Sequence, residues 1–159
     1  MIARYYIIFI SLFVYGCNPG PNEKPSIDDL AGVYTLVEAP SICGRMDPNL
    51  LATISLKSDL SISFENIPDC IYEGYRDSEV VGKQLSGNGT WEIVVPELAS
   101  SYGVMVNISG VNSMHAGSYS SWMIIGKEKP FQLVYVIGDP DSMHYLIYQK
   151  LGELSGENS

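Results

Sequence analysis

The sequence predicts an all-β domain of about eight antiparallel strands. Apolar and polar residues alternate with a period of two along most of the chain, and the three-to-four spacing of an amphipathic helix is nowhere sustained. Short connections rich in Gly, Pro, Asn and Asp separate the alternating segments, and connections this short join antiparallel strands. These observations favour a meander, in which each strand pairs with the next one along the chain.

The clearest unit is a hairpin over residues 52–64. Six apolar residues share one parity on the two sides of a turn at Ser58-Asp59, so both strands can place them on a single buried face. These six are Ala52, Ile54, Leu56, Leu60, Ile62 and Phe64. Six further strands are expected over 32–37, 89–95, 103–109, 119–126, 131–137 and 143–150.

Segments between the strands carry other signals. Residues 25–30 predict a short helical turn capped by Ser26, with acidic residues at its start. The segment 66–82 predicts a long irregular loop, and turn residues are expected at 87–89 and at 139–142. We expect a single β domain over 27–151, followed by a disordered tail at 152–159.

The first residues carry a targeting signal. Arg4 precedes an apolar run that ends in Val14-Tyr15-Gly16-Cys17, and a run of about a dozen residues is shorter than the roughly 20 needed to cross a bilayer. This layout resembles the signal of bacterial lipoproteins. The resemblance implies that residues 1–16 are a signal peptide, that Cys17 is lipidated, and that 17–26 form a flexible tether. Asn18 after the lipidated cysteine implies a place in the cell envelope, at the outer membrane, and two or more acyl chains anchor a protein stably.

The mature chain is acidic. Without residues 1–16, which contain Arg4 and no acid, 8 of the 9 Lys and Arg residues remain against 18 Asp and Glu residues, a net charge of −10. This charge disfavours nucleic acid and anionic lipid headgroups, so we expect membrane contact through the lipid alone. A basic protein partner is compatible with it.

Cys43 and Cys70 remain once Cys17 is assigned to lipid. A pair of cysteines in an oxidising compartment predicts a disulfide, closing a loop of about 28 residues. Neither lies in a C-x-x-C motif, so the expected role is structural.

The strand pattern, opening with Gly32-Val33-Tyr34, resembles lipocalin-like β-barrels, whose first strand commonly carries G-x-W. A flattened β-sandwich is the alternative. A barrel of this size either holds one small ligand or is filled by its own side chains. The candidate pocket residues are Tyr34, Trp91, Trp122 and Tyr135, with Met123 and Tyr145 as further candidates. Ordinary core packing is the preferred interpretation of all six, because small barrels usually fill themselves.

Signs of catalysis are scarce. The chain has two histidines, His115 and His144, and lacks H-E-x-x-H, G-x-S-x-G and a phosphate-binding Gly loop. We therefore expect a non-enzyme with no metal and no cofactor, in which both histidines are incidental and His144 lies on the outer face of the last strand.

Two function classes fit these signals. The first is a non-catalytic, lipid-anchored protein-binding module, similar in format to lipoprotein inhibitors of lysozyme and to lipid-anchored immunity proteins. Its candidate contact residues are Tyr72, Tyr75 and Arg76, because Tyr and Arg are favoured interface anchors. The second class is a lipocalin-type carrier of a small apolar ligand, which would use the mouth of the barrel.

Overall fold

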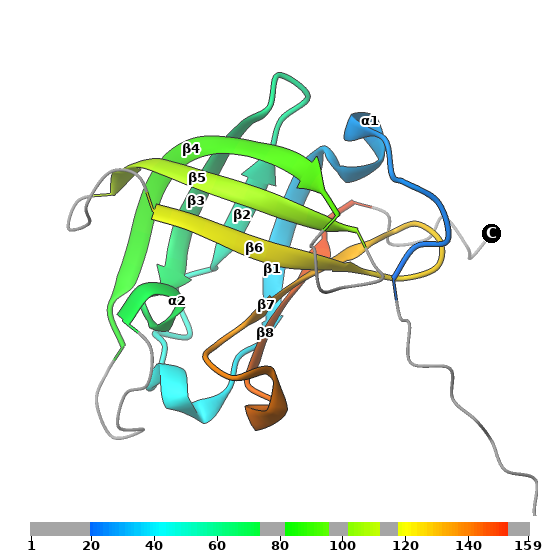
Figure 1. Ribbon diagram of the computed structural model, residues 1–159. Helices are drawn as coiled ribbons and strands as arrows, with labels where there is room; N and C mark the ends of the chain where they lie inside the picture. The colour runs from blue at the N-terminus through cyan, green and yellow to red at the C-terminus, as the bar shows by residue number, and fades with distance from the viewer. Residues whose placement is uncertain (1–19, 74–81, 96–101, 112–117, 153–159) are drawn as a thin grey trace, which may run out of the picture.

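Eight antiparallel strands close into a barrel in the computed structural model, which describes residues 20–73, 82–95, 102–111 and 118–152 (Figure 1). Each strand pairs with its neighbours in chain order, and β1 pairs with β8 to close the ring. The predicted all-β meander and its closure into a barrel are confirmed, and the alternative, a flattened sandwich, is wrong. The strands are β1 Gly32–Glu38, β2 Thr53–Leu56, β3 Ser61–Pro68, β4 Gln84–Val94, β5 Gly103–Val111, β6 Ser118–Ile125, β7 Gln132–Val136 and β8 Tyr145–Lys150.

The predicted hairpin is formed by β2 and β3. Leu56 lies opposite Ile62 and Ile54 opposite Phe64, and all four side chains are buried, as their shared parity requires. The turn is one residue longer than expected, because Leu60 adopts a positive φ of 64° and donates its N–H to the carbonyl of Lys57. Leu60 is 37% exposed and therefore belongs to the surface, not to the predicted buried set.

The core fills the inside of the barrel. The inward-facing residues of all eight strands join one apolar cluster, which Leu30 at the end of α1 (Ile27–Leu30) completes. The predicted cap of this helical turn is confirmed, since Ser26 Oγ accepts the N–H of Asp29 and Asp29 accepts the N–H of Ser26.

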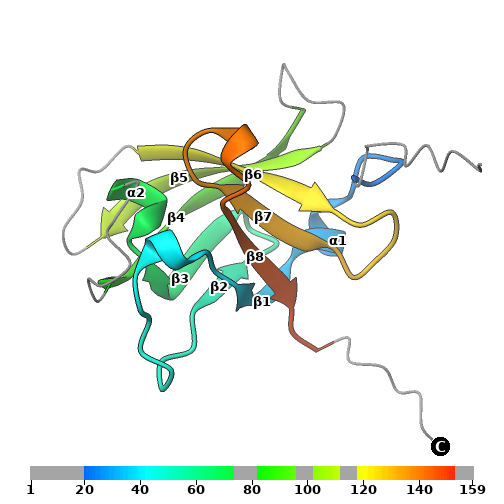
Figure 2. The ribbon, with the colours of Figure 1, turned by 90° about the horizontal axis from the view of Figure 1, so that it is seen from below.

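The barrel has two distinct ends. The N-terminal end carries α1, the β2–β3 turn, the β6–β7 connection and the last residues of β8. The opposite end carries η1 (Ser41–Cys43), α2 (Cys70–Glu73) and η2 (Pro140–Ser142), and we call it the disulfide end. Figure 2, seen from below, shows η1 and α2 side by side and well separated from α1.

Two local predictions are wrong. β4 begins at Gln84, so Gly87-Asn88-Gly89 lies inside a strand and forms no turn. A Cβ on Gly89 would lie 2.1 Å from the carbonyl oxygen of Asn107. Glycine is therefore required here, because β4 and β5 approach each other closely at a bulge. β3 likewise continues to Pro68 through a bulge at Asn66, and the expected irregular loop contains the helical turn α2.

Candidate functional site

The four predicted pocket aromatics are placed in the barrel wall with their polar atoms bonded to the chain itself. At the N-terminal end the Tyr34 hydroxyl donates to the carbonyl of Leu30 at 2.8 Å, and Trp91 Nε1 donates to the carbonyl of Lys57 at 3.0 Å. Trp122 Nε1 donates to Ser120 Oγ at 2.7 Å. Tyr34, Trp91 and Trp122 are buried.

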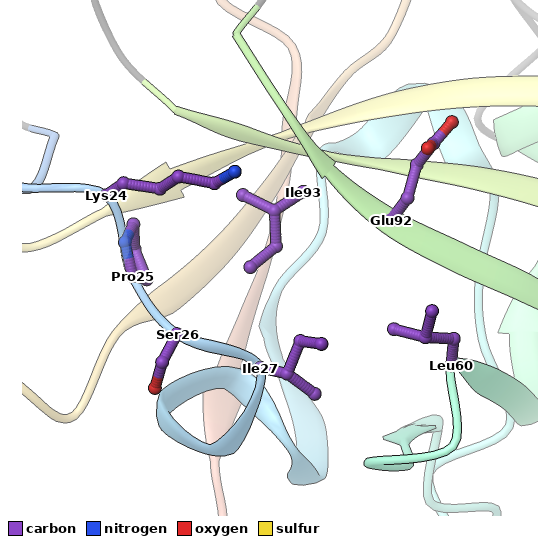
Figure 3. Close-up of a pocket in the computed structure, with 7 residues that line it drawn as sticks. All are labelled: Lys24, Pro25, Ser26, Ile27, Leu60, Glu92 and Ile93. Carbon is purple, nitrogen blue, oxygen red and sulfur yellow. The ribbon is translucent and has the colours of Figure 1, made fainter.

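Trp122 is packed between two tyrosines. Its ring centroid lies 5.2 Å from that of Tyr135 and 5.4 Å from that of Tyr148, both in tilted geometry. Two grooves lie outside the barrel at the N-terminal end, one of about 480 Å³ (Figure 3) and one of about 390 Å³, and none of these aromatics lines either. The arrangement is that of a packed core, which favours the core-packing interpretation of these residues.

Met123 and Tyr145 do not face the interior. They alternate along β6 and β8 with the buried Trp122 and Leu146, and successive side chains of a strand point to opposite faces. Both therefore lie on the outer face of the sheet, and the prediction that they line a pocket is wrong.

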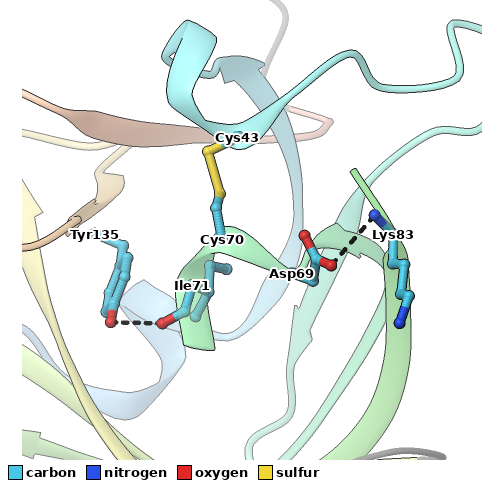
Figure 4. The surroundings of a disulfide bond; sticks show 6 residues. All are labelled: Cys43, Asp69, Cys70, Ile71, Lys83 and Tyr135. Carbon is cyan, nitrogen blue, oxygen red and sulfur yellow. Dashed lines mark hydrogen bonds between the residues drawn. A yellow bond between two sulfur atoms is a disulfide. The ribbon is translucent and has the colours of Figure 1, made fainter. Parts of the chain in front are cut away.

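A disulfide organises the opposite end of the barrel. Cys43 and Cys70 are bonded, with an S–S distance of 2.10 Å and a Cα–Cα distance of 5.0 Å, and both are fully buried (Figure 4). The predicted pairing is confirmed. The bond joins η1, in the β1–β2 connection, to α2, in the β3–β4 connection.

Hydrogen bonds brace the same end. Asp69, which is 1% exposed, accepts the N–H of Lys83 at 3.2 Å and donates its own N–H to the Lys83 carbonyl at 3.0 Å. These bonds hold the chain where it leaves β3 and where it returns to β4. Gly82 is close-packed here, because a Cβ would lie 2.4 Å from the carbonyl oxygen of Cys43.

Tyr135 ties α2 to the barrel wall. Its hydroxyl donates to the carbonyl of Ile71 at 2.9 Å, and burial raises the pKa of this hydroxyl, so it stays protonated as a donor. Figure 4 shows the Tyr135–Ile71 bond beside the disulfide. The disulfide end is thus fixed to β3, β4 and β7.

Four large apolar side chains are exposed at this braced end. Their exposed fractions are 52% for Val37, 44% for Leu50, 60% for Leu51 and 75% for Met143. Val37 lies in β1, Leu50 and Leu51 lie in the β1–β2 connection shortly before β2, and Met143 lies two residues before the start of β8. Because β1 pairs with both β2 and β8, these positions lie on three adjacent segments. We call Val37, Leu50, Leu51 and Met143 the apolar patch.

Acidic residues accompany the apolar patch. Among the side chains described at the disulfide end, six carboxylates stand against two cations, Arg45 and Lys83, a net charge of −4. Four of the six carboxylates are exposed and lie close in the chain to residues of the apolar patch: Glu38, Asp47, Asp139 and Asp141. The other two are Glu65 and Asp69.

Sequence reasoning missed the apolar patch and directed attention to Tyr72, Tyr75 and Arg76. Tyr72 lies in α2, at the same end of the barrel, whereas Tyr75, Arg76 and the lipidation candidate Cys17 lie outside the described residues. The available signal was Leu50-Leu51, an apolar pair in a segment that lacks the alternation of a strand. Such a pair can be assigned to the surface only when it is known whether the neighbouring connections cover it.

The remaining expectations concern histidines and metal ligands. His144 precedes β8 and does not lie on its outer face; it is half-buried, and its carbonyl accepts the N–H of Ile137 at 2.9 Å. His115 lies outside the described residues. Within the described part of the chain, no group of three His, Cys, Asp or Glu side chains is arranged to hold a metal ion, and no helix has the length and apolar character to cross a membrane. Comparisons of the chain with known protein families, curated proteins and solved structures found no match.

Proposed function

We propose that this protein is a lipid-anchored component of the bacterial cell envelope, held at the outer membrane through Cys17, whose disulfide end binds a basic protein without catalysis. An inhibitor or an immunity protein works in this way. The observation that carries the proposal is the apolar patch, four exposed apolar side chains on a cross-braced, acidic surface.

The chemistry of this end suits a protein interface. Binding energy concentrates in a few apolar or aromatic anchors, and surrounding polar groups exclude water from them. Acidic groups around the anchors attract a basic partner and raise its association rate. The buried disulfide and the Tyr135–Ile71 hydrogen bond hold the backbone in place, so little conformational entropy is lost on binding.

Residues of the β3–β4 connection extend the proposed surface. Tyr72 belongs to α2, which the disulfide joins to the β1–β2 connection that carries Leu50 and Leu51. Tyr75 and Arg76 follow α2 in the sequence, and all three remain proposed contact residues. Anchoring through Cys17 rests on the signal sequence that precedes it.

Packing in the barrel favours a binding module over a small-ligand carrier. A carrier needs apolar side chains around an open space, with polar tips available to the ligand. Here the polar tips of Tyr34, Trp91 and Trp122 already bond to the protein's own chain, and Trp122 packs between two tyrosines in tilted geometry.

Site-directed photo-crosslinking in living cells of the native host tests the proposal. A photoreactive amino acid in place of Leu51 should yield a covalent adduct with a basic protein, because Leu51 lies in the proposed interface. The same amino acid in place of Val33, which is 40% exposed on β1 at the N-terminal end, is the matched control and should not capture that protein. Equal capture at both positions, or no protein adduct from Leu51 and Met143, would contradict the proposal.

A further inference from the structure

We infer that the N-terminal end of the barrel lies directly against the lipid bilayer, so that the disulfide end faces away from it. This inference rests on the proposed lipid anchor at Cys17 and specifies what the anchor does to the domain. The surface involved is different from the proposed partner site.

The segment before α1 is packed against the protein. Gly20, Pro21 and Pro25 are buried, although they belong to the expected flexible tether. Residues 21–25 share the groove of about 390 Å³ with the β6–β7 connection, including Lys127, Lys129 and Phe131. This part of the chain therefore has a fixed place beside the barrel.

Two charged contacts hold the neighbouring helical turn. Lys129 forms an ion pair with Asp29, and Lys150 Nζ donates to the carbonyl of Asp29 at 3.0 Å. These contacts join α1 to the β6–β7 connection and to the end of β8. The position of the packed segment is thus tied to the N-terminal end of the barrel.

The length of chain left for a tether is short. Gly20 is only three residue steps beyond Cys17, and three extended steps span about 10 Å. A free tether from Cys17 to Pro25 would span about 28 Å at the same extension. The lipidated residue must therefore lie within about 10 Å of Gly20, which brings the N-terminal end to the headgroup layer.

Exposed apolar side chains give this end a surface that suits the bilayer interface. Ile27 is 38% exposed, Val95 61% and Leu151 43%. Figure 3 shows Ile27, Leu60 and Ile93 around the groove of about 480 Å³, with Lys24 and Glu92 at its sides. Leu60 stays exposed at a positive φ, a conformation that usually belongs to Gly or Asn.

The charge of the two ends differs in the direction that the inference requires. Described side chains at the N-terminal end comprise five lysines against six carboxylates, a net charge of −1, whereas the disulfide end carries −4. Lysines place their apolar stems on a surface and their ammonium groups among phosphates. The negative charge of the whole chain is therefore no obstacle to contact between this end and the headgroup layer. The five lysines are Lys24, Lys57, Lys127, Lys129 and Lys150, and the six carboxylates are Glu23, Asp28, Asp29, Asp59, Glu92 and Glu128.

Lipid quenching of a fluorescent label measures which end contacts the bilayer. Leu60 or Met143 is replaced by an alkyne-bearing amino acid and coupled to an environment-sensitive dye. The protein is then reconstituted in vesicles of phosphatidylethanolamine and phosphatidylglycerol that contain a spin-labelled lipid. We expect at least twofold stronger quenching at position 60 than at position 143. Val95 and Asp141 form a second pair of label positions, which keeps the test informative if a label at position 60 disturbs the turn.

The design separates failure of the orientation from failure of the anchor. The mass of the purified protein reports acylation at Cys17 independently of quenching. If Cys17 carries no acyl chain, the proposed anchor is wrong, and the mature chain coupled to a maleimide lipid through Cys17 still tests the geometry. Equal quenching at the two ends, or stronger quenching at position 143, would overturn the inference. Cross-linking of two copies through position 60 with no lipid quenching would assign the surface to a second copy and would also overturn it.

Discussion

Removal of the Cys43–Cys70 disulfide should lower the free energy of unfolding of the barrel by an amount that follows from the length of the loop it closes. The bond closes a loop with a sequence separation of 27, for which the chain-entropy relation gives about 3.5 kcal/mol at 25 °C. Both sulfur atoms are fully buried, so each Cys→Ala change also removes packing, at about 1 kcal/mol. Cys43→Ala alone should therefore cost about 4.5 kcal/mol, and adding Cys70→Ala should cost only about 1 kcal/mol more.

The assay is urea denaturation followed by tryptophan fluorescence. Trp91 and Trp122 are buried in the core, so their emission reports unfolding of the barrel. Reduction of the unmodified protein provides the control, since it removes the cross-link and leaves the sulfur atoms in place; it should cost about 3.5 kcal/mol. If the two single substitutions each cost half of the double substitution, the loss comes from packing, and the loop-closure reasoning is refuted.

Three further predictions concern single sites. Gly89→Ala should destabilise the fold by about 3 kcal/mol in urea denaturation, because its Cβ would meet the Asn107 carbonyl; a loss below about 0.5 kcal/mol would mean that the two strands separate easily. The pKa of Asp29 is lowered from 3.8 to about 2, chiefly by its hydrogen bond from Lys129 and then by Ser26, so its stabilising effect is complete above about pH 4 and is lost as the pH falls towards 2. Lys129→Ala should raise this pKa towards 3.8 in a carboxyl ¹³C NMR titration, and an unchanged value would show that Ser26 alone is responsible. Cys17→Ser should abolish incorporation of labelled fatty acid in cells, whereas continued labelling would exclude Cys17 as the lipidated residue.

Period-two alternation was sufficient to predict the sheet because half of each strand faces a dry interior. The hairpin of β2 and β3 shows this most clearly, since one parity supplies all of its buried residues up to the bulge at Asn66. Closure of the barrel was also predictable in outline, as short connections between consecutive strands leave few other topologies.

Features that depend on contacts between distant segments were not predictable. Gly89 has the sequence context of a turn residue, but a glycine is required there because the Asn107 carbonyl of the neighbouring strand leaves no room for a Cβ. Met143 follows the strand pattern of β8, yet it adopts a positive φ of 56° and lies exposed before the strand begins.

The proposed site shows the same limit. Val37, Leu50, Leu51 and Met143 come to lie on neighbouring segments only because β1 pairs with both β2 and β8. The disulfide, in contrast, was predictable from the number of cysteines. Its role in fixing that surface was not, because this role depends on η1 and α2 meeting at one end of the barrel.

Binding of a basic protein at the disulfide end is tested by the affinity of the protein for the partner captured at Leu51. Val37→Lys and Val33→Lys place the same substitution on the same strand at opposite ends of the barrel, on side chains that are 52% and 40% exposed. Titration calorimetry should show at least a tenfold loss of affinity, about 1.4 kcal/mol, for Val37→Lys, because an apolar contact is removed and a like charge faces a basic partner. Val33→Lys should change the affinity less than twofold. Equal affinities for the two variants, or a larger loss for Val33→Lys, would contradict binding at the disulfide end.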